Sequence, residues 1–158
     1  MFGGGSEEQR IIVQEIRLIT NQFAAGANAN IEHIALASDI RIASEDAKIA
    51  FLFVKVGLAG TDMAASYLLP RVVGLAKATE MLFTGDFISA TEAERIGLYN
   101  RVVPAAELAT TTHDFAMRLA RGPAFALGKT KEMLNRELDM DLQAALESEA
   151  QAQAICMQ

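Results

Sequence analysis

The pattern of apolar and polar positions predicts strands in the first part of the chain and helices in the rest. Residues 39–43 alternate between apolar and polar side chains, as a half-buried strand does, and residues 47–56 form a second extended stretch rich in Phe and Val. Residues 98–103 are a third predicted strand, which Pro104 ends because proline has no backbone N–H to donate to a sheet.

Helical periodicity covers most of the remaining chain. From residue 7 to residue 23 the apolar side chains recur at helical spacing, with charged residues between them. Further helices are predicted at residues 63–74, 75–83, 89–97, 105–121, 123–138 and 142–158. We therefore expect an α/β core over residues 1–104 and an all-helical region over residues 105–158.

The ends of these helices carry recognisable capping residues. Thr61 or Asp62 is the expected N-cap of the helix that begins at residue 63, and glycines at positions 74, 85 and 97 are expected to end three helices. Ser89 opens a Ser-Ala-Thr-Glu capping box, in which the Glu92 side chain can reach back to the Ser89 amide.

Composition excludes several classes of protein. The 158 residues fit one domain of ordinary size, and the net charge of -6 with scattered basic residues argues against a nucleic-acid surface. No apolar run approaches the roughly 18 residues of a membrane-spanning helix. The single cysteine, Cys156, excludes an internal disulfide framework and suits a cytoplasmic location. Two histidines and one cysteine are too few for a convincing zinc site, so no metal is expected.

Several short motifs follow one another in an order typical of one family. They occupy residues 37–48, 56–58, 68–74, 82–85 and 89–104, the last with the sequence Ser-Ala-Thr-Glu-Ala-Glu-Arg-Ile-Gly-Leu-Tyr-Asn-Arg-Val-Val-Pro. Over about residues 24–158 the chain resembles the crotonase (enoyl-CoA hydratase/isomerase) superfamily. The resemblance implies part of a spiral ββα core, followed by an all-helical trimerisation region.

The same comparison of motifs indicates either a truncated chain or a chain of ordered segments joined together, with other segments omitted. Almost none of the strands that begin the family's core are present, the family strand expected just before Ala24 is absent, and the C-terminal tail stops early. The glycines at positions 3–5 are either a remnant of the family's first oxyanion-hole turn or an artificial linker.

The resemblance implies an oxyanion hole, in which two backbone N–H groups hold the thioester oxygen while negative charge develops on it. One donor maps to the amides of Gly26 and Ala27, and the other to Ser6 or its neighbour. The small residues of this turn would let the backbone approach the thioester. Without the resemblance, the same turn would be a helix start with no ligand.

A hydratase of this family also needs two carboxylates. Counting forward from Gly26 places Asn30 at the first acid position, whereas counting back from Asp39 places His33 there. Glu32 is the nearest carboxylate, and its alternative is a solvated surface position.

The second acid position falls at Phe53, which cannot move a proton. Some subfamilies place an acid in the following loop instead, and that position matches Asp62. Asp62 is therefore the second catalytic candidate, and its alternative role is helix capping.

The leading interpretation is an acyl-CoA thioester enzyme that hydrates a 2-enoyl-CoA. The alternatives are a hydrolase, dehalogenase or C–C lyase of the same fold, or a non-catalytic CoA-binding subunit. CoA enters as part of the substrate, without another cofactor, and Lys129 and Lys131 are candidate contacts to its phosphates. The apolar residues Leu142, Leu146 and Ile155 suit packing beyond the chain, in the homotrimer or dimer of trimers that the family usually forms.

Overall fold

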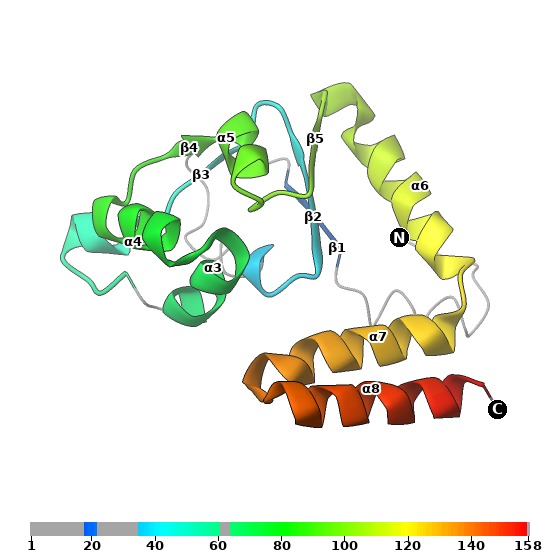
Figure 1. Cartoon of the computed structure of the whole chain (residues 1–158). Helices are drawn as coiled ribbons and strands as arrows, with labels where there is room; N and C mark the ends of the chain where they lie inside the picture. The colour runs from blue at the N-terminus through cyan, green and yellow to red at the C-terminus, as the bar shows by residue number, and fades with distance from the viewer. Residues whose placement is uncertain (1–17, 22–34, 61–63, 158) are drawn as a thin grey trace. The chain divides into compact units, whose positions relative to one another are not determined.

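The structure, a computed structural model, describes residues 18–21, 35–60 and 64–157. The chain divides into two compact units, a first unit of residues 17–114 and a second unit whose described part is residues 115–157. The division between residues 114 and 115 falls within one helix (Figure 1). The described strands belong to the first unit, and the second unit is helical in its described part.

The first unit is built on three parallel strands in the order β1-β2-β5. These strands are β1 (Leu18–Asn21), β2 (Ile40–Ser44) and β5 (Arg101–Val103). The helices between β2 and β5 supply the crossover that a parallel connection requires. A separate antiparallel pair joins β3 (Lys48–Ile49) to β4 (Ile88–Ser89).

Strand β1 corrects two expectations. Its residues were assigned to a helix by their periodicity, yet they pair with β2, with Leu18 opposite Ile40 and Asn21 opposite Ala43. A strand of four residues is too short for periodicity to separate it from a helix. The strand expected just before Ala24 is therefore present.

The stretch over residues 47–56 is extended only at its start. After β3, the 3₁₀-helix η1 (Leu52–Val56) begins, and it ends at Gly57, whose φ of 77° is left-handed. Of the Phe and Val residues that suggest a strand, only Phe51 is buried, at 1% exposed, whereas Val54 and Val56 are exposed.

Three helices follow η1 in the first unit. They are α3 (Ala65–Val73), α4 (Leu75–Thr84) and α5 (Ala90–Arg95). The predicted ends at Gly74 and Gly85 are confirmed, and both glycines have positive φ. The predicted start of α3 is wrong: the helix begins at Ala65, and its N-cap is Ala64 with a left-handed φ of 67°. Thr61 and Asp62, the predicted caps, lie outside the described residues.

The predicted N-cap of α5 is confirmed, because the Ser89 hydroxyl accepts the Glu92 N–H at 3.2 Å. The Glu92 carboxylate does not complete the capping box as expected. It accepts two hydrogen bonds from Arg95, at 2.6 and 2.8 Å, and lies 3.6 Å from the Lys77 ammonium. A charged partner one turn away competes effectively with a backbone amide for the same oxygens.

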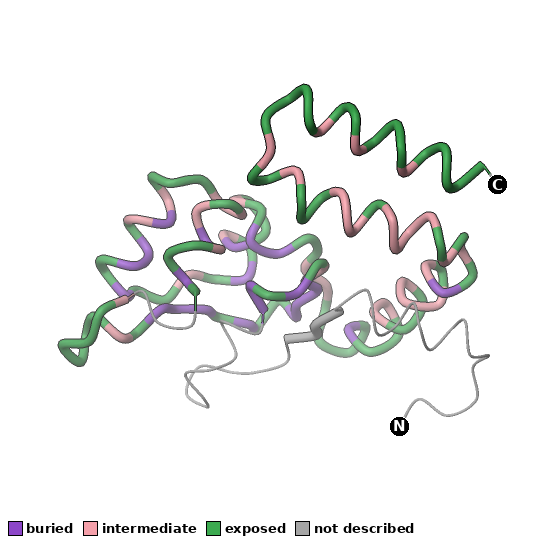
Figure 2. Tube along the Cα trace, turned by 90° about the horizontal axis from the view of Figure 1, so that it is seen from below, coloured by how far each residue is buried: buried purple, intermediate pink, exposed green. Residues whose placement is uncertain are grey.

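One apolar core joins these elements (Figure 2). Its largest fully buried side chains are those of Phe51, Ile49, Leu69 and Leu98. The core therefore lies where β2 and β3 meet α3, α4 and the turn after α5.

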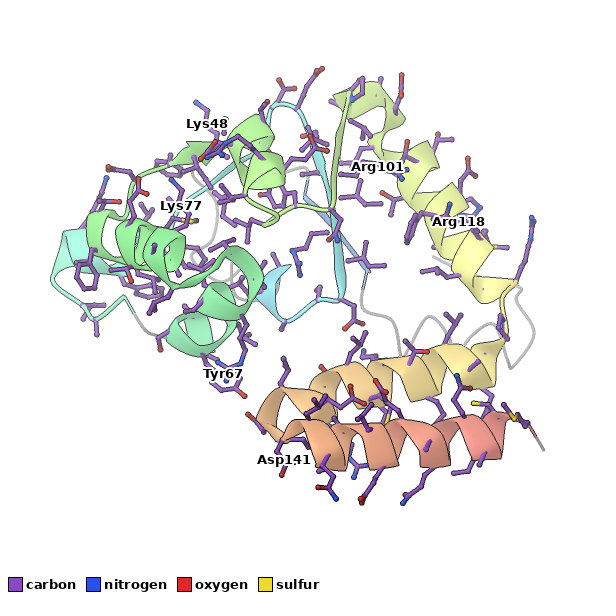
Figure 3. All side chains as sticks on the ribbon, viewed as in Figure 1. Lys48, Tyr67, Lys77, Arg101, Arg118 and Asp141 are labelled. Atoms are coloured by element: carbon purple, nitrogen blue, oxygen red, sulfur yellow. The ribbon has the colours of Figure 1, made fainter. Side chains whose placement is uncertain are left out.

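The chain after β5 is helical, as predicted. It contains η3 (Ala105–Glu107), α6 (Leu108–Ala120), α7 (Ala124–Arg136), η4 (Glu137–Asp139) and α8 (Leu142–Cys156). Helices α7 and α8 lie side by side as a hairpin (Figure 1). The Asp141 carboxylate caps α8 by accepting the Ala144 N–H at 2.9 Å, and its position is labelled in Figure 3. Neither α7 nor α8 contains a buried residue.

Candidate active site

The 3₁₀-helix η1 carries Phe53, the residue that the family resemblance predicts at the second hydratase position. Its side chain is half-buried, and its carbonyl accepts the Leu58 N–H at 3.0 Å. The residues of η1 are Leu, Phe, Val, Lys and Val, so none of them is an acid. Lys55 is paired with Asp86 at 2.7 Å. Helix η1 therefore has no side chain that could accept or donate a proton as a carboxylate does.

Helix η1 packs against the C-terminal end of α4 at Gly85. A Cβ at this glycine would lie 3.0 Å from the Phe51 carbonyl oxygen and 3.2 Å from side-chain atoms of Val54 and Lys55. The φ of 60° at Gly85 also favours glycine. This close approach fixes the position of η1, and of the start of the loop after it, relative to the C-terminal end of α4.

Asp62 lies outside the residues that the structure describes, but the residues on both sides of its segment are described. A Cβ on Gly60 would lie 2.8 Å from the Leu82 carbonyl oxygen, so only glycine allows this approach to α4. On the other side, Ala65 is fully buried in the core. The chain is thus anchored to the core two residues before Asp62 and three residues after it.

The other residues predicted to form the thioester site, like Asp62, cannot be placed in the structure. Glu32, Gly26, Ala27 and Ser6 all lie outside the described residues, so their assignments stay predictions. The described chain resumes at Ala35 and Leu36, which form a helical turn and are both buried.

Sequence reasoning missed Arg41, the buried cation that follows this turn. Its side chain is 7% exposed, and its guanidinium donates to the backbone carbonyls of Leu98, Ser38 and Ala35. Burial lowers the pKa of Arg41 from its ordinary value, while Asp39 and Tyr99 act in the opposite direction. The sequence does contain a signal for a buried Arg41. The arginine lies between two isoleucines, in a strand whose other residues are mostly buried.

The two lysines predicted to contact CoA both lie on α7. Lys129 donates to the Glu132 carboxylate at 2.7 Å, and Arg136 donates to the same carboxylate at 3.1 Å. These two cations, Lys129 first, hold the pKa of Glu132 below its ordinary value. Lys131 is half-buried on the same helix. The ammonium of Lys129 therefore already has an anionic partner.

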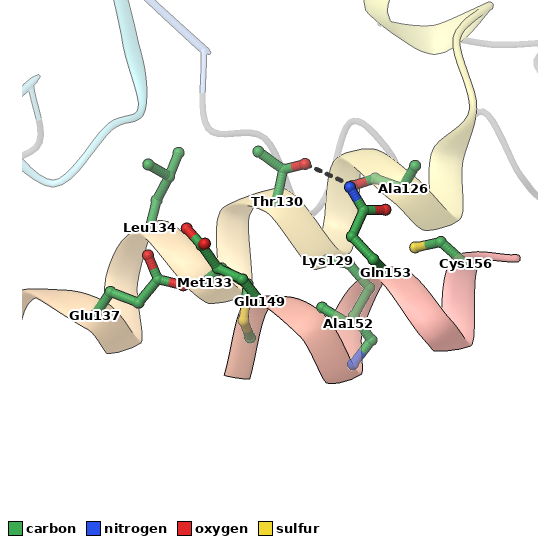
Figure 4. A pocket seen from close by; sticks show the side chains of 10 residues that line it. All are labelled: Ala126, Lys129, Thr130, Met133, Leu134, Glu137, Glu149, Ala152, Gln153 and Cys156. Atoms are coloured by element: carbon green, nitrogen blue, oxygen red, sulfur yellow. Dashed lines mark hydrogen bonds between the residues drawn. The ribbon is translucent and has the colours of Figure 1, made fainter. Parts of the chain in front are cut away.

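A groove of about 460 Å³ runs between α7 and α8, and Lys129 lines it whereas Lys131 does not (Figure 4). Its floor contains Ala126 and Ala152, and polar groups border it, among them Glu149 and Gln153. All the residues that line the groove belong to the second unit. The groove is therefore a surface of this unit alone, open to a ligand or a protein segment.

The described residues form neither a metal-binding cluster nor a membrane-spanning helix. Among residues 18–21, 35–60 and 64–157, no group of three or more His, Cys, Asp or Glu side chains could hold a metal ion. No helix in the described part of the chain is long and apolar enough to cross a membrane.

Comparison with known proteins defines the class. The family model of enoyl-CoA hydratase/isomerase matches residues 19–158. The chain therefore belongs to the enoyl-CoA hydratase/isomerase family, and the crotonase resemblance of its motifs is confirmed.

Individual relatives agree with this assignment. The chain is 39% identical over 122 residues to a probable enoyl-CoA hydratase of Mycobacterium tuberculosis, covering 77% of this chain and 42% of that protein. It is 37% identical over 135 residues to the 1,2-epoxyphenylacetyl-CoA isomerase of Escherichia coli, covering 85% of this chain and 50% of the isomerase.

A crystal structure of enoyl-CoA hydratase/isomerase from Cupriavidus metallidurans matches with a TM-score of 0.82 and 31% identity. The match covers 95% of this chain and 57% of that one. The crotonase fold is thus confirmed, and the chain spans about half the length of the curated relatives it matches.

Proposed function

We propose that this chain acts on acyl-CoA thioesters, and that the reaction is hydration of a 2-enoyl-CoA. Membership of the enoyl-CoA hydratase/isomerase family and the relative named as a probable hydratase support this proposal. The thioester enolate would be held by backbone N–H groups at Gly26 and Ala27 on one side and Ser6 on the other. Backbone donors suit this task because they are oriented before charge develops.

The observation that shapes the proposal is the apolar η1 helix. With Phe53 at the second hydratase position, proton transfer needs an acid from another segment. We assign it to Asp62, with Glu32 as its partner. The anchoring of the chain at Gly60 and Ala65 supports this assignment, because a catalytic loop must start and end at fixed points.

The proposed step conserves atoms and charge. A carboxylate takes a proton from water, the water oxygen bonds to the β-carbon, and the electron pair of the double bond moves to the thioester oxygen. A carboxylic acid of the pair then donates a proton to the α-carbon, which restores the thioester carbonyl, and the proton taken from water replaces the one that the pair has donated. No metal or redox cofactor enters this scheme, and CoA takes part only as the carrier of the acyl group.

Isomerisation is the second candidate. The match to the 1,2-epoxyphenylacetyl-CoA isomerase and the absence of an acid from η1 both favour it. A single carboxylate can remove a proton at one carbon and return it at another, whereas hydration conventionally divides the work between two acids. Failure to hydrate crotonyl-CoA would leave the hydrolase, dehalogenase, C–C lyase and non-catalytic alternatives.

The test follows the conjugated thioester absorbance of crotonyl-CoA. We expect Asp62→Asn to lower kcat by about 100-fold or more, the scale of one general acid–base group. Asp86→Asn is the matched control, because Asp86 is exposed and paired with Lys55. CoA binding without turnover by the wild-type protein would overturn the hydratase proposal, and full activity in Asp62→Asn would remove Asp62 from the mechanism.

The proposal includes a cytoplasmic location and a homotrimer or dimer of trimers. A single exposed cysteine supports a reducing compartment. The exposed apolar side chains on α7 and α8 support assembly, since large exposed apolar surfaces mark interaction sites.

A further inference from the structure

Charged residues are segregated along the second unit. Its first part, residues 115–136, contains five basic residues and one acidic residue, which are Arg118, Arg121, Lys129, Lys131, Arg136 and Glu132. Its second part, residues 137–157, contains no lysine or arginine and five acidic residues, which are Glu137, Asp139, Asp141, Glu147 and Glu149. Each part can therefore attract the oppositely charged part of a second copy.

Helix α8 has a side that is both apolar and acidic. Leu142, Leu146 and Glu149 follow at spacings of four and three residues, so they lie along one side of the helix. All three are exposed, Leu142 by 76% and Leu146 by 56%. The other charged residue of α8 is Glu147, which is also exposed. A partner that covers Leu142, Leu146 and Glu149, named the acidic face, therefore meets apolar side chains and negative charge.

The end of α6 and the start of α7 carry the opposite combination. Arg118 and Arg121 are three residues apart in the last turn of α6 and just after it, so their side chains are neighbours. Phe125 follows on α7 and is 57% exposed. Both arginines are exposed, and neither is paired with a carboxylate of the described residues. Arg118, Arg121 and Phe125 are named the basic face.

The acidic and basic faces are not joined within one chain. Figure 3 labels Arg118 and Asp141, the residue before α8, and shows them at opposite ends of the second unit. Among the described residues, no ion pair joins α8 to a lysine or arginine. A contact of α8 with the α8 of another copy would set glutamate against glutamate, and like charges across an interface cost free energy. The favourable partner for the acidic face is therefore the basic face of a second copy.

We propose that the acidic face of one copy packs against the basic face of the next copy in the assembled protein. This inference rests on the proposed homotrimer. A contact between two different surfaces leaves one of each unused at the ends of a row, and closing the row into a ring, such as a trimer, uses them all. Arginine and aromatic side chains are enriched in interfaces, and the two leucines supply apolar area.

Charge reversal of each face tests the contact. Arg118→Glu with Arg121→Glu should weaken self-association about tenfold or more, because it sets acids against the acidic face. Glu147→Lys with Glu149→Lys should weaken it to a similar extent, because it sets cations against the basic face. Sedimentation equilibrium gives the association constant of each variant. An unchanged association constant in the arginine variant, as a contact between two α8 helices would give, would overturn the proposal.

The control for net charge is Lys48→Glu with Arg71→Glu. It changes the net charge as the arginine variant does, but at exposed positions of the first unit. Self-association of this control should change by less than about twofold, because salt screens exposed charges that are far from the contact. A loss equal to that of the arginine variant would show a general charge effect and overturn the proposal.

The variant that combines all four changes at the two faces is the decisive measurement. It exchanges the charges of the two faces and keeps the net charge of the chain, so self-association should return to within about threefold of the wild type. A combined variant that associates more weakly than either double variant would overturn the proposal. If the wild-type chain stays monomeric, the proposed assembly fails and this contact fails with it. If the wild type assembles but the arginine variant assembles equally well, only this contact fails, and the crotonyl-CoA assay reports on the proposed reaction separately.

Discussion

The two units bury their apolar residues to very different extents. In the first unit, Leu69 and Leu98 are fully buried, and helices α3 and α4 each bury residues against a shared core. In the second unit, α7 and α8 bury none, and Leu142 remains 76% exposed. The first unit thus contains its own core, whereas the helical hairpin has an apolar surface without a partner in the described chain.

Buried and exposed apolar residues contribute to the molecule in different ways. Apolar side chains that converge on one core stabilise the fold by leaving water, about 25 cal/mol for each Å² buried. Apolar side chains that remain exposed contribute little to the fold of their own chain, and large groups of them mark interaction surfaces. Equal hydrophobicity in the sequence therefore predicts unequal effects of mutation.

The largest expected effect tests this contrast directly. Leu69→Ala should lower the free energy of unfolding by about 2–5 kcal/mol, because it leaves a cavity in a packed core. Leu146→Ala, at a position 56% exposed on α8, should change it by less than about 0.5 kcal/mol. Urea unfolding followed by circular dichroism measures both changes. Comparable losses in the two variants would contradict the contrast.

A smaller effect concerns assembly. The double variant Leu142→Lys with Leu146→Lys should weaken self-association about tenfold or more, because it places two charges on a surface proposed to pack against another copy. Analytical ultracentrifugation gives the association constant, and the thermal midpoint of the first unit should stay unchanged.

Gln143→Lys with Gln151→Lys is the matched control for assembly, since it adds the same two positive charges and both side chains are exposed and polar on the same helix. A loss of association in the control equal to that in the leucine variant would attribute the effect to net charge. Unchanged association in the leucine variant would remove this surface from the assembly.

The fold was predictable where local chemistry decides it. Gly74 and Gly85 end helices because the backbone needs positive φ there, and Ser89 begins one through its hydroxyl. Strand β1 was not predictable in this way, because a short apolar run becomes a strand only beside a partner such as β2. The start of α3 at Ala65 depends on a left-handed alanine that no propensity favours.

The site was predictable to a smaller extent. The contacts of Arg41 depend on Leu98 and Asn100, which lie 57 and 59 residues further along the chain, so spacing alone could not indicate them. The pairing of Lys129 with Glu132 is different, because residues three apart on a helix are neighbours and the sequence contains this signal. Asp62 and Glu32 remain predictions based on family resemblance.

The smallest expected effect concerns this ion pair and the predicted CoA contact of Lys129. Glu132→Gln releases Lys129 from its carboxylate partner, so CoA should bind about two- to threefold more tightly at neutral pH if Lys129 contacts a phosphate, as expected for one exposed charge pair. Glu147→Gln removes the same charge from α8 and is the control. Isothermal titration calorimetry with CoA measures both variants. An equal gain in CoA affinity in the two variants would show only the general negative potential of the acidic chain. An unchanged CoA affinity in Glu132→Gln would exclude the contact of Lys129 with a phosphate.

The pH dependence of the pair provides an independent check on its strength. The pKa of Glu132 lies below its ordinary value of 4.5 because Lys129 and Arg136 bind its charged form. A depressed carboxyl pKa contributes stability above the unfolded value and loses it as the pH falls through the folded value. The difference in unfolding midpoint between wild type and Glu132→Gln should therefore be constant near neutrality and disappear only below about pH 4.5. A difference that disappears well above this pH would show that another group controls the stability of α7, and that Lys129 is paired elsewhere.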